Sequence, residues 1–191
     1  MPKKTFLNRI ISGFKERFGP VHYQAQPQQK PQYTLPPVIS KDHRQLFIEQ
    51  AQKAGITPEE FGTIAKREQG ATTLPNQAAL VGGMDPSDKG VMQVNKVNEA
   101  LVQKNFLKEF GRTYNPNNAE DSIIAARMVL EENKRIFEQM IKNKSFQGSY
   151  TNTDLVNSYN LGPKGVIQAR QGDQEKQDRL KRYESAGLIN N

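Results

Sequence analysis

Residues 61–70 read FGTIAKREQG, the pattern of a short helix that carries an acid on its inner face. The apolar residues Phe61, Ile64 and Ala65 are spaced i, i+3 and i+4, so they share one helical face. Glu68 follows at i+7 and falls on the same face. Desolvation by apolar neighbours and the negative end of the helix dipole would both raise the pKa of a carboxyl group at this place. A carboxyl group that stays protonated near neutral pH can act as a general acid.

The ends of this helix are well marked. Thr57 is a predicted N-cap, Pro58 suits the first helical position, and Glu60 completes a capping box. Gly70 is suited to the stop. A single acid near a helix end is nevertheless more often solvated or salt-bridged than catalytic, so the remaining sequence has to decide the role of Glu68.

The composition limits the kinds of protein that the chain can be. Lys and Arg number 27 against 20 Asp and Glu in 191 residues, which gives a net charge of +7. A basic balance favours an anionic partner such as nucleic acid, a membrane surface or a cell-wall polymer. Because there is no cysteine, disulfides, zinc–thiolate sites and thiol nucleophiles are excluded. His22 and His43 lack partners at metal-ligand spacing, so we expect no metal and no cofactor.

Residues 1–19 are predicted to form a basic amphipathic helix. Phe6, Ile10 and Phe14 belong to its apolar stripe, and lysines and arginines supply the charge. Such a helix can lie on an anionic membrane surface or dock in a partner's groove. It can equally pack on the main domain, and the sequence favours neither role over the other.

Residues 20–40 are rich in proline and glutamine and predict an extended linker. A boundary near Ser40 leaves residues 41–191 as one folded domain. No window offers the ~18 apolar residues of a transmembrane helix, and Asn8 and Arg9 interrupt the core of any signal peptide. Action outside the cytoplasm would therefore need another route, such as a virion, lysis or a dedicated secretion machine.

The folded domain is predicted to be mainly helical, with few strand signals. Residues 71–90 have the glycines and prolines of a loop. Asn118 is a predicted N-cap, and Thr151 with Asp154 has capping-box spacing at the start of a helix that should end at residues 160–163. Helices are predicted within residues 41–54, 58–70, 97–110, 119–143, 151–160 and about 174–186.

Three short motifs occur in order along this domain. Residues 68–70 read EQG, residues 90–93 read GVMQ, and residues 158–162 read SYNLG. In this order the motifs resemble those of the soluble lytic transglycosylase (SLT) catalytic domain, which has a lysozyme-like fold related to goose-type lysozyme. The resemblance covers roughly residues 42–186. It implies a mainly α, lysozyme-like catalytic domain with minimal β structure, preceded by the amphipathic helix and the linker.

One residue departs from the family pattern, and another agrees with it. The family pattern has serine after the catalytic glutamate, where this chain has Gln69, so the hydrogen bond that the serine lends to the active site is in doubt. Tyr183, in the last predicted helix, stands where the family often has a C-terminal tyrosine.

The resemblance implies an enzyme that cleaves the β-1,4 bond between N-acetylmuramic acid and N-acetylglucosamine in peptidoglycan. Glu68 would protonate the glycosidic oxygen and then deprotonate the muramoyl 6-hydroxyl, which closes a 1,6-anhydro ring. The amides of Gln93 and Asn160 and the hydroxyl of Tyr159 would bind the sugar. Met92 is also a candidate contact, although packing beneath the cleft suits it better.

Other functions stay open at this point. A goose-type muramidase would hydrolyse the same bond with a second carboxylate, for which Asp85 or Asp88 is suitably placed; Asn95 stands where such enzymes tend to have an aspartate. An inactive structural or wall-binding virion protein is suggested by Gln69 and by the appended N-terminal segments. Nucleic-acid binding has only the net charge in its favour and is not expected.

The expected partner is therefore the peptidoglycan glycan strand. Residues 1–19 could attach the domain to a phage particle, a secretion apparatus or an anionic membrane surface. The place of action would be the cell wall, in the periplasm or at the cell surface, as for a virion-associated lysin or an enzyme exported by a dedicated machine.

Overall fold

The computed structural model describes residues 33, 35, 39–70 and 91–186 of the chain. The predicted N-terminal helix, most of the predicted linker and the 71–90 loop lie outside these residues. The described part belongs to one packed unit that begins at Tyr33. Its elements are two 3-10 helices, η1 (Lys41–His43) and η2 (Lys96–Asn98), and six α-helices: α2 (Arg44–Ala54), α3 (Pro58–Gly70), α5 (Glu99–Phe110), α6 (Ala119–Lys142), α7 (Asn152–Arg170) and α8 (Gln174–Ala186).

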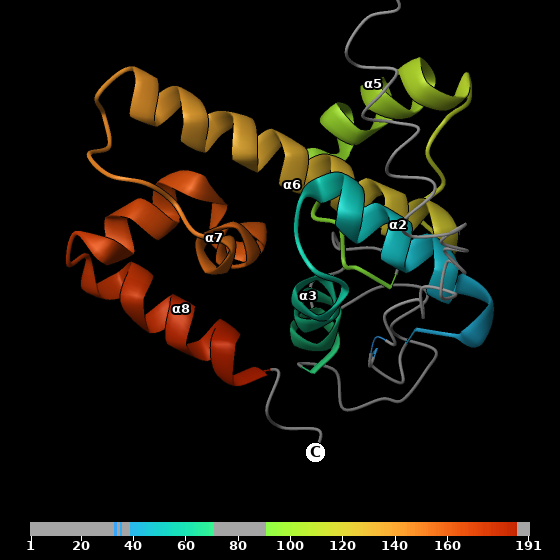
Figure 1. Cartoon of the computed structure of the whole chain (residues 1–191), viewed down its shortest axis with the longest axis horizontal. Helices are drawn as coiled ribbons and strands as arrows, with labels where there is room; N and C mark the ends of the chain where they lie inside the picture. The colour runs from blue at the N-terminus through green and yellow to red at the C-terminus, as the bar shows by residue number, and fades with distance from the viewer. Residues whose placement is uncertain (1–32, 34, 36–38, 71–90, 187–191) are drawn as a thin grey trace, which may run out of the picture. The chain divides into compact units, whose positions relative to one another are not determined.

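The long helix α6 is the centre of this unit and packs against α2, α5 and α7 (Figure 1). Asn118 caps its start, because its side-chain oxygen accepts a hydrogen bond from the backbone N–H of Asp121 at 2.9 Å. Every residue from 121 to 130 is buried. Residues 121–130 of α6 are thus enclosed on all sides, which explains why most of them are apolar.

Helix α3 packs against α2, α7 and α8, and its inner face is the one predicted. Phe61, Ile64 and Ala65 have no exposed surface, and the Phe61 ring lies 4.6 Å from that of Phe47 on α2. The predicted capping box is also confirmed. The Thr57 hydroxyl accepts from the N–H of Glu60 at 3.1 Å, and the Glu60 carboxylate accepts from the N–H of Thr57 at 2.8 Å.

Helix α7 is broken where a stop was predicted, but it does not end there. Gly162 has φ 69° and ψ 160°, a conformation that glycine adopts readily and other residues rarely do. Pro163 then opens a second helical segment that runs to Arg170, since proline suits a first helical position. The stop was therefore predicted correctly, whereas the continuation was missed. The capping box of Thr151 and Asp154 at the start of α7 is confirmed.

The packed core begins earlier than the predicted boundary near residue 40. Leu35 and Ile39 are buried, with 8% and 2% of their surface exposed, and Tyr33 packs against the same core. The high proline and glutamine content of residues 20–40 predicted a linker throughout. Leu35 and Ile39 are nevertheless apolar, and they are removed from water by packing in the hydrophobic core.

The prediction of a mainly helical domain is confirmed. Extended pairing among the described residues is confined to a bridge at Val94. No helix in the described ranges is both long and apolar enough to cross a membrane.

Candidate active site

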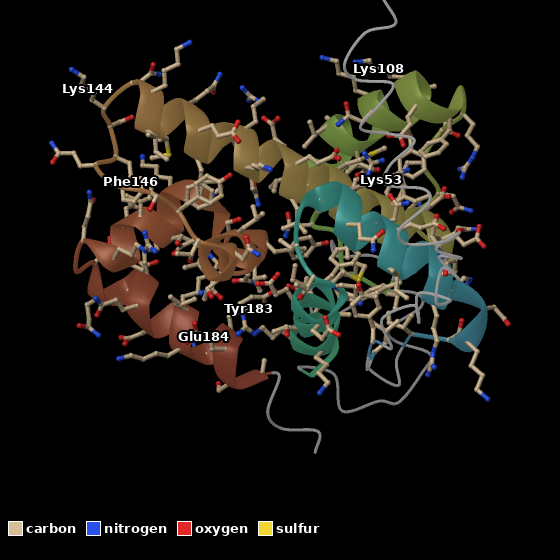
Figure 2. The ribbon with its side chains drawn as sticks, in the orientation of Figure 1. Lys53, Lys108, Lys144, Phe146, Tyr183 and Glu184 are labelled. Atoms are coloured by element: carbon tan, nitrogen blue, oxygen red, sulfur yellow. The ribbon has the colours of Figure 1, made fainter. Side chains whose placement is uncertain are left out.

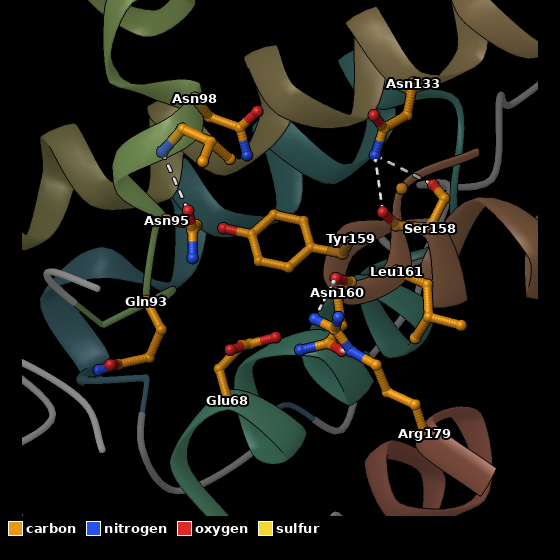
Figure 3. Close-up of a pocket in the computed structure, with 12 residues that line it drawn as sticks. Glu68, Gln93, Asn95, Asn98, Asn133, Ser158, Tyr159, Asn160, Leu161 and Arg179 are labelled. Atoms are coloured by element: carbon orange, nitrogen blue, oxygen red, sulfur yellow. Dashed lines mark hydrogen bonds between the residues drawn. The ribbon is translucent and has the colours of Figure 1, made fainter. Parts of the chain in front are cut away.

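A cleft of about 420 Å³ opens between α3, α7, α8 and the segment around η2 (Figure 3). Its described lining is dominated by amide and hydroxyl side chains, with one acid and one base. Such a surface suits a ligand that is rich in hydroxyl and acetamido groups. The lining residues are Glu68, Gln93, Asn95, Val97, Asn98, Asn133, Ser158, Tyr159, Asn160, Leu161, Gly162 and Arg179.

Glu68 is the only acid among the described residues that line this cleft. It lies in the last turn of α3, above the buried side chains of Ile64 and Ala65, and one of its carboxylate oxygens is buried. The helical spacing of the sequence has thus placed a carboxyl group partly inside the core while it still faces the cleft (Figure 3). This arrangement confirms that Glu68 is drawn inward.

Tyr183 of α8 lies next to this carboxyl group. Its side chain is on the face of α8 that is turned to α3 (Figure 2), and its hydroxyl oxygen is buried. Burial, and after it the charge of Glu68, raise the pKa of Tyr183 well above its ordinary value. The phenol therefore stays neutral, and its O–H is a potential donor to the Glu68 carboxylate.

Arg67, the residue before Glu68, ties three helices together behind the site. Its guanidinium carbon lies 5.1 Å from the centre of the Tyr183 ring, in a cation–π arrangement. Its Nη1 donates to Oδ1 of Asn157 on α7 at 2.8 Å, and the Asn157 amide donates to Oε1 of Glu184 on α8 at 3.2 Å. These contacts fix α8 against α3 at Tyr183 and at the next residue, Glu184.

Gln93 reaches the cleft from a backbone conformation that non-glycine residues rarely adopt, with φ at 49°. Hydrogen bonds to both backbone groups of the preceding residue, Met92, hold it there. The N–H of Met92 donates to Oγ of Ser122 at 3.0 Å, and the carbonyl of Met92 accepts from the Tyr159 hydroxyl at 2.8 Å. Strained backbone of this kind persists where the surroundings determine it, and it is common at functional sites.

These bonds refine two of the predicted roles. Met92 is fully buried and does not line the cleft, so it packs beneath the site. Tyr159 lines the cleft, but its O–H donor is directed to the Met92 carbonyl. Its observed part is therefore to hold the wall that carries Gln93. Asp85 and Asp88, the candidates for a second carboxylate, lie outside the described residues.

Asn160 is oriented by Arg179. Nε of Arg179 donates to Oδ1 of Asn160 at 3.1 Å, and Nη2 donates to its backbone carbonyl at 3.1 Å. An arginine has only donors, so the oxygen of the amide must face it. The NH₂ group of Asn160 is therefore the part of the amide that can donate to a ligand in the cleft.

Several lining residues were not predicted to belong to the cleft, although Asn95 was noted at the position of a goose-type aspartate. Asn133 donates to both the backbone oxygen and the hydroxyl of Ser158 at 3.0 Å, and this bond fastens α6 to α7 beside the cleft. The sequence feature that could have indicated Asn133 is its polar side chain on the otherwise apolar face of α6. Asn95 accepts from the N–H of Val97 at 2.9 Å and caps η2, which leaves Val97 85% exposed at the rim. Arg179 stands in a mostly charged helix, where no pattern distinguishes it.

Comparison with known proteins identifies the family of this chain. No curated protein and no solved structure matches the chain significantly. The family model of the transglycosylase SLT domain matches residues 45–181, which include every residue of the cleft named above. The mainly helical fold is the lysozyme-like one that this domain implies. The chain therefore belongs to the SLT family of peptidoglycan lytic transglycosylases.

Proposed function

We propose that this protein cleaves the β-1,4 bond between N-acetylmuramic acid and N-acetylglucosamine and leaves a 1,6-anhydromuramoyl end. The observation that supports this most directly is the partly buried Glu68 carboxyl group, the only acid among the described residues of a cleft lined by amides and hydroxyls. One carboxyl group is enough for this reaction, because the nucleophile belongs to the substrate.

The proton balance of the reaction fits a single group. Glu68 gives its proton to the glycosidic oxygen as the bond from that oxygen to C1 breaks. The substrate's own acetamido group can stabilise the positive charge that develops at C1. The 6-hydroxyl of the same sugar then attacks C1 and returns its proton to Glu68. No water is consumed, in contrast to glycosidases that use two carboxylates.

The neighbouring side chains are assigned to binding and positioning. The amides of Gln93 and Asn160 are proposed to bind hydroxyl and acetamido groups on opposite walls of the cleft (Figure 3). The neutral Tyr183 phenol is proposed to donate to the Glu68 carboxylate after the first proton transfer, when that group carries a charge. Tyr159 is proposed to act indirectly by keeping Gln93 in place.

Product analysis tests the reaction. Purified peptidoglycan is digested with the full chain, and the fragments are analysed by mass spectrometry. We expect anhydromuramoyl ends, which are lighter by one water than hydrolysed ends. Reducing muramic acid ends would contradict the proposal and favour the muramidase; Asp85→Asn and Asp88→Asn would then identify its second carboxylate. If the wild-type protein releases no fragments but still binds the wall, the inactive wall-binding alternative is correct.

The N-terminal segments are proposed to deliver the domain to the cell wall. The basic amphipathic pattern of residues 1–19 supports docking to a phage particle, a secretion apparatus or an anionic membrane surface. A chain without residues 1–32, cut before the packed unit begins at Tyr33, should digest purified wall normally and lose particle or membrane association. Association that survives this deletion would contradict the docking role.

A further inference from the structure

Arg179 is the only positively charged residue among the described residues that line the cleft. It is exposed on α8 at the side of the cleft where Asn160 lies (Figure 3). Its two hydrogen bonds to Asn160, from Nε and Nη2, hold the guanidinium plane in one orientation. A long side chain at the rim is thus fixed before any ligand arrives, which lowers the entropic cost of using it.

The charge of Arg179 is not matched within the described part of the domain. The guanidinium has five N–H donors, and its two hydrogen bonds to Asn160 use two of them. No carboxylate of a described residue pairs with Arg179; the nearby Asp178 lies instead 3.9 Å from Lys181. The Nη1 group is not used in the bonds to Asn160. Such a planar group with two donors suits a carboxylate.

We propose that Arg179 forms a subsite for a carboxylate carried by the muramic acid residue of the substrate. The carboxylate is either that of the lactyl ether, in strands without peptide, or one on the stem peptide. This subsite rests on the proposed function, and it adds a charge criterion to a cleft that otherwise recognises neutral sugar groups. The enzyme then prefers muramic acid strands over a neutral polymer with the same β-1,4 backbone.

The test measures binding in the inactive Glu68→Gln variant of the full chain. Three ligands of similar length are compared by calorimetry: chitohexaose, which has no carboxylate, peptide-free glycan strands, and strands with stem peptides. The readout is the affinity ratio of each carboxylated ligand to chitohexaose. We expect a ratio of about fivefold at low salt, and a ratio near one in 1 M salt, where the Debye length is only about 3 Å.

Variants in the same background separate charge recognition from support of Asn160. Arg179→Gln should bring the ratio close to one, and Arg179→Lys should keep part of it. Lys181→Gln removes the same charge from the same helix outside the cleft and should leave the ratio unchanged. If Arg179→Gln weakens all three ligands equally, the ratio persists and Arg179 only positions Asn160, which overturns the inference.

The three ligands also show which carboxylate is bound. They further distinguish failure of the subsite from failure of the proposed function. A preference confined to peptide-free strands assigns the lactyl carboxylate, and one confined to peptide-bearing strands assigns the stem. Equal affinity of the Glu68→Gln protein, with Arg179 intact, for all three ligands overturns the carboxylate subsite alone. Failure to bind any of them overturns the proposed function, and the subsite with it.

Discussion

The two walls of the cleft are held by different physical means. The wall that carries Gln93 is fixed by buried bonds between neutral groups: the Met92 N–H donates to the Ser122 hydroxyl, and the Met92 carbonyl accepts from the Tyr159 hydroxyl. The opposite wall, at Asn160, is fixed by the exposed charged side chain of Arg179. The first wall is insensitive to salt, whereas the second carries a charge that solvent can screen.

This difference assigns separate tasks to the two sides of Glu68. The neutral wall keeps a strained residue in one conformation, so it supplies fixed geometry. The charged wall adds little stability, because exposed ionic groups contribute little to folding, but it can select among ligands. Substitutions that affect one wall at a time test whether geometry and selection can be separated in this way.

The largest effect is expected from Glu68→Gln. General acid–base catalysis contributes about 10²- to 10⁴-fold, so release of wall fragments should fall by at least a hundredfold. Both walls stay intact, and therefore glycan binding and the melting temperature should change little. The control is Glu59→Gln, which removes an exposed acid from the same helix. A variant that lost binding together with turnover would show that Glu68 also holds the walls.

Tyr159→Phe should damage the neutral wall. The variant leaves the buried Met92 carbonyl without the donor that lies 2.8 Å away, at a cost of roughly 1–3 kcal/mol in the free energy of unfolding. Gln93 then loses a support for its φ of 49°, so activity should fall as well. Denaturant unfolding and fragment release measure the two effects. Full activity with lowered stability would show that Gln93 keeps its position without this bond.

The sequence predicted the parts of this site that follow local rules. The inner face of α3, the capping boxes and the place of Glu68 depend on spacings of three or four residues, and all were confirmed. Gln93 and Asn160 came from the motif order. Arg179 could not be predicted, because its role depends on how α8 lies against α7, and no local pattern encodes that packing.

A smaller effect is expected at Asp121 behind the neutral wall, and its change with pH falls in the acidic range. Burial alone would raise its pKa, but hydrogen bonds from Arg112 and from the Asn115 backbone, with the Arg112 charge, outweigh burial and hold the pKa below its ordinary value of about 3.8. The pair therefore stabilises the fold fully above that value. The contribution is lost as the pH falls through the lower pKa of the folded state.

Melting temperatures measured from pH 7 to pH 2 test this point. The wild-type protein should be more stable than Asp121→Asn at neutral pH, and the difference should shrink as the solution becomes acidic. A difference that stays constant over this range would mean that the charge of Asp121 is not what stabilises the start of α6.

The smallest effect is expected from Tyr114→Phe, the matched control for Tyr159→Phe. The Tyr114 hydroxyl is buried too, but it has no hydrogen-bond partner among the described residues. Its removal strands no acceptor there, so the free energy of unfolding should change by less than about 0.5 kcal/mol or rise slightly. A loss as large as that for Tyr159→Phe would reveal a partner in the 71–90 segment or another part outside the described residues.

The bond between Tyr159 and Met92 has a consequence for the order of folding. It joins groups 67 residues apart, and Tyr183, beside Glu68, follows later still in the sequence. A chain that emerges from the ribosome in sequence order exposes Glu68 and Gln93 long before the residues that arrange them. The geometry proposed for catalysis therefore forms only after α7 and α8 have been synthesised and docked, so we expect a nascent or truncated chain to contain Glu68 without the arranged cleft.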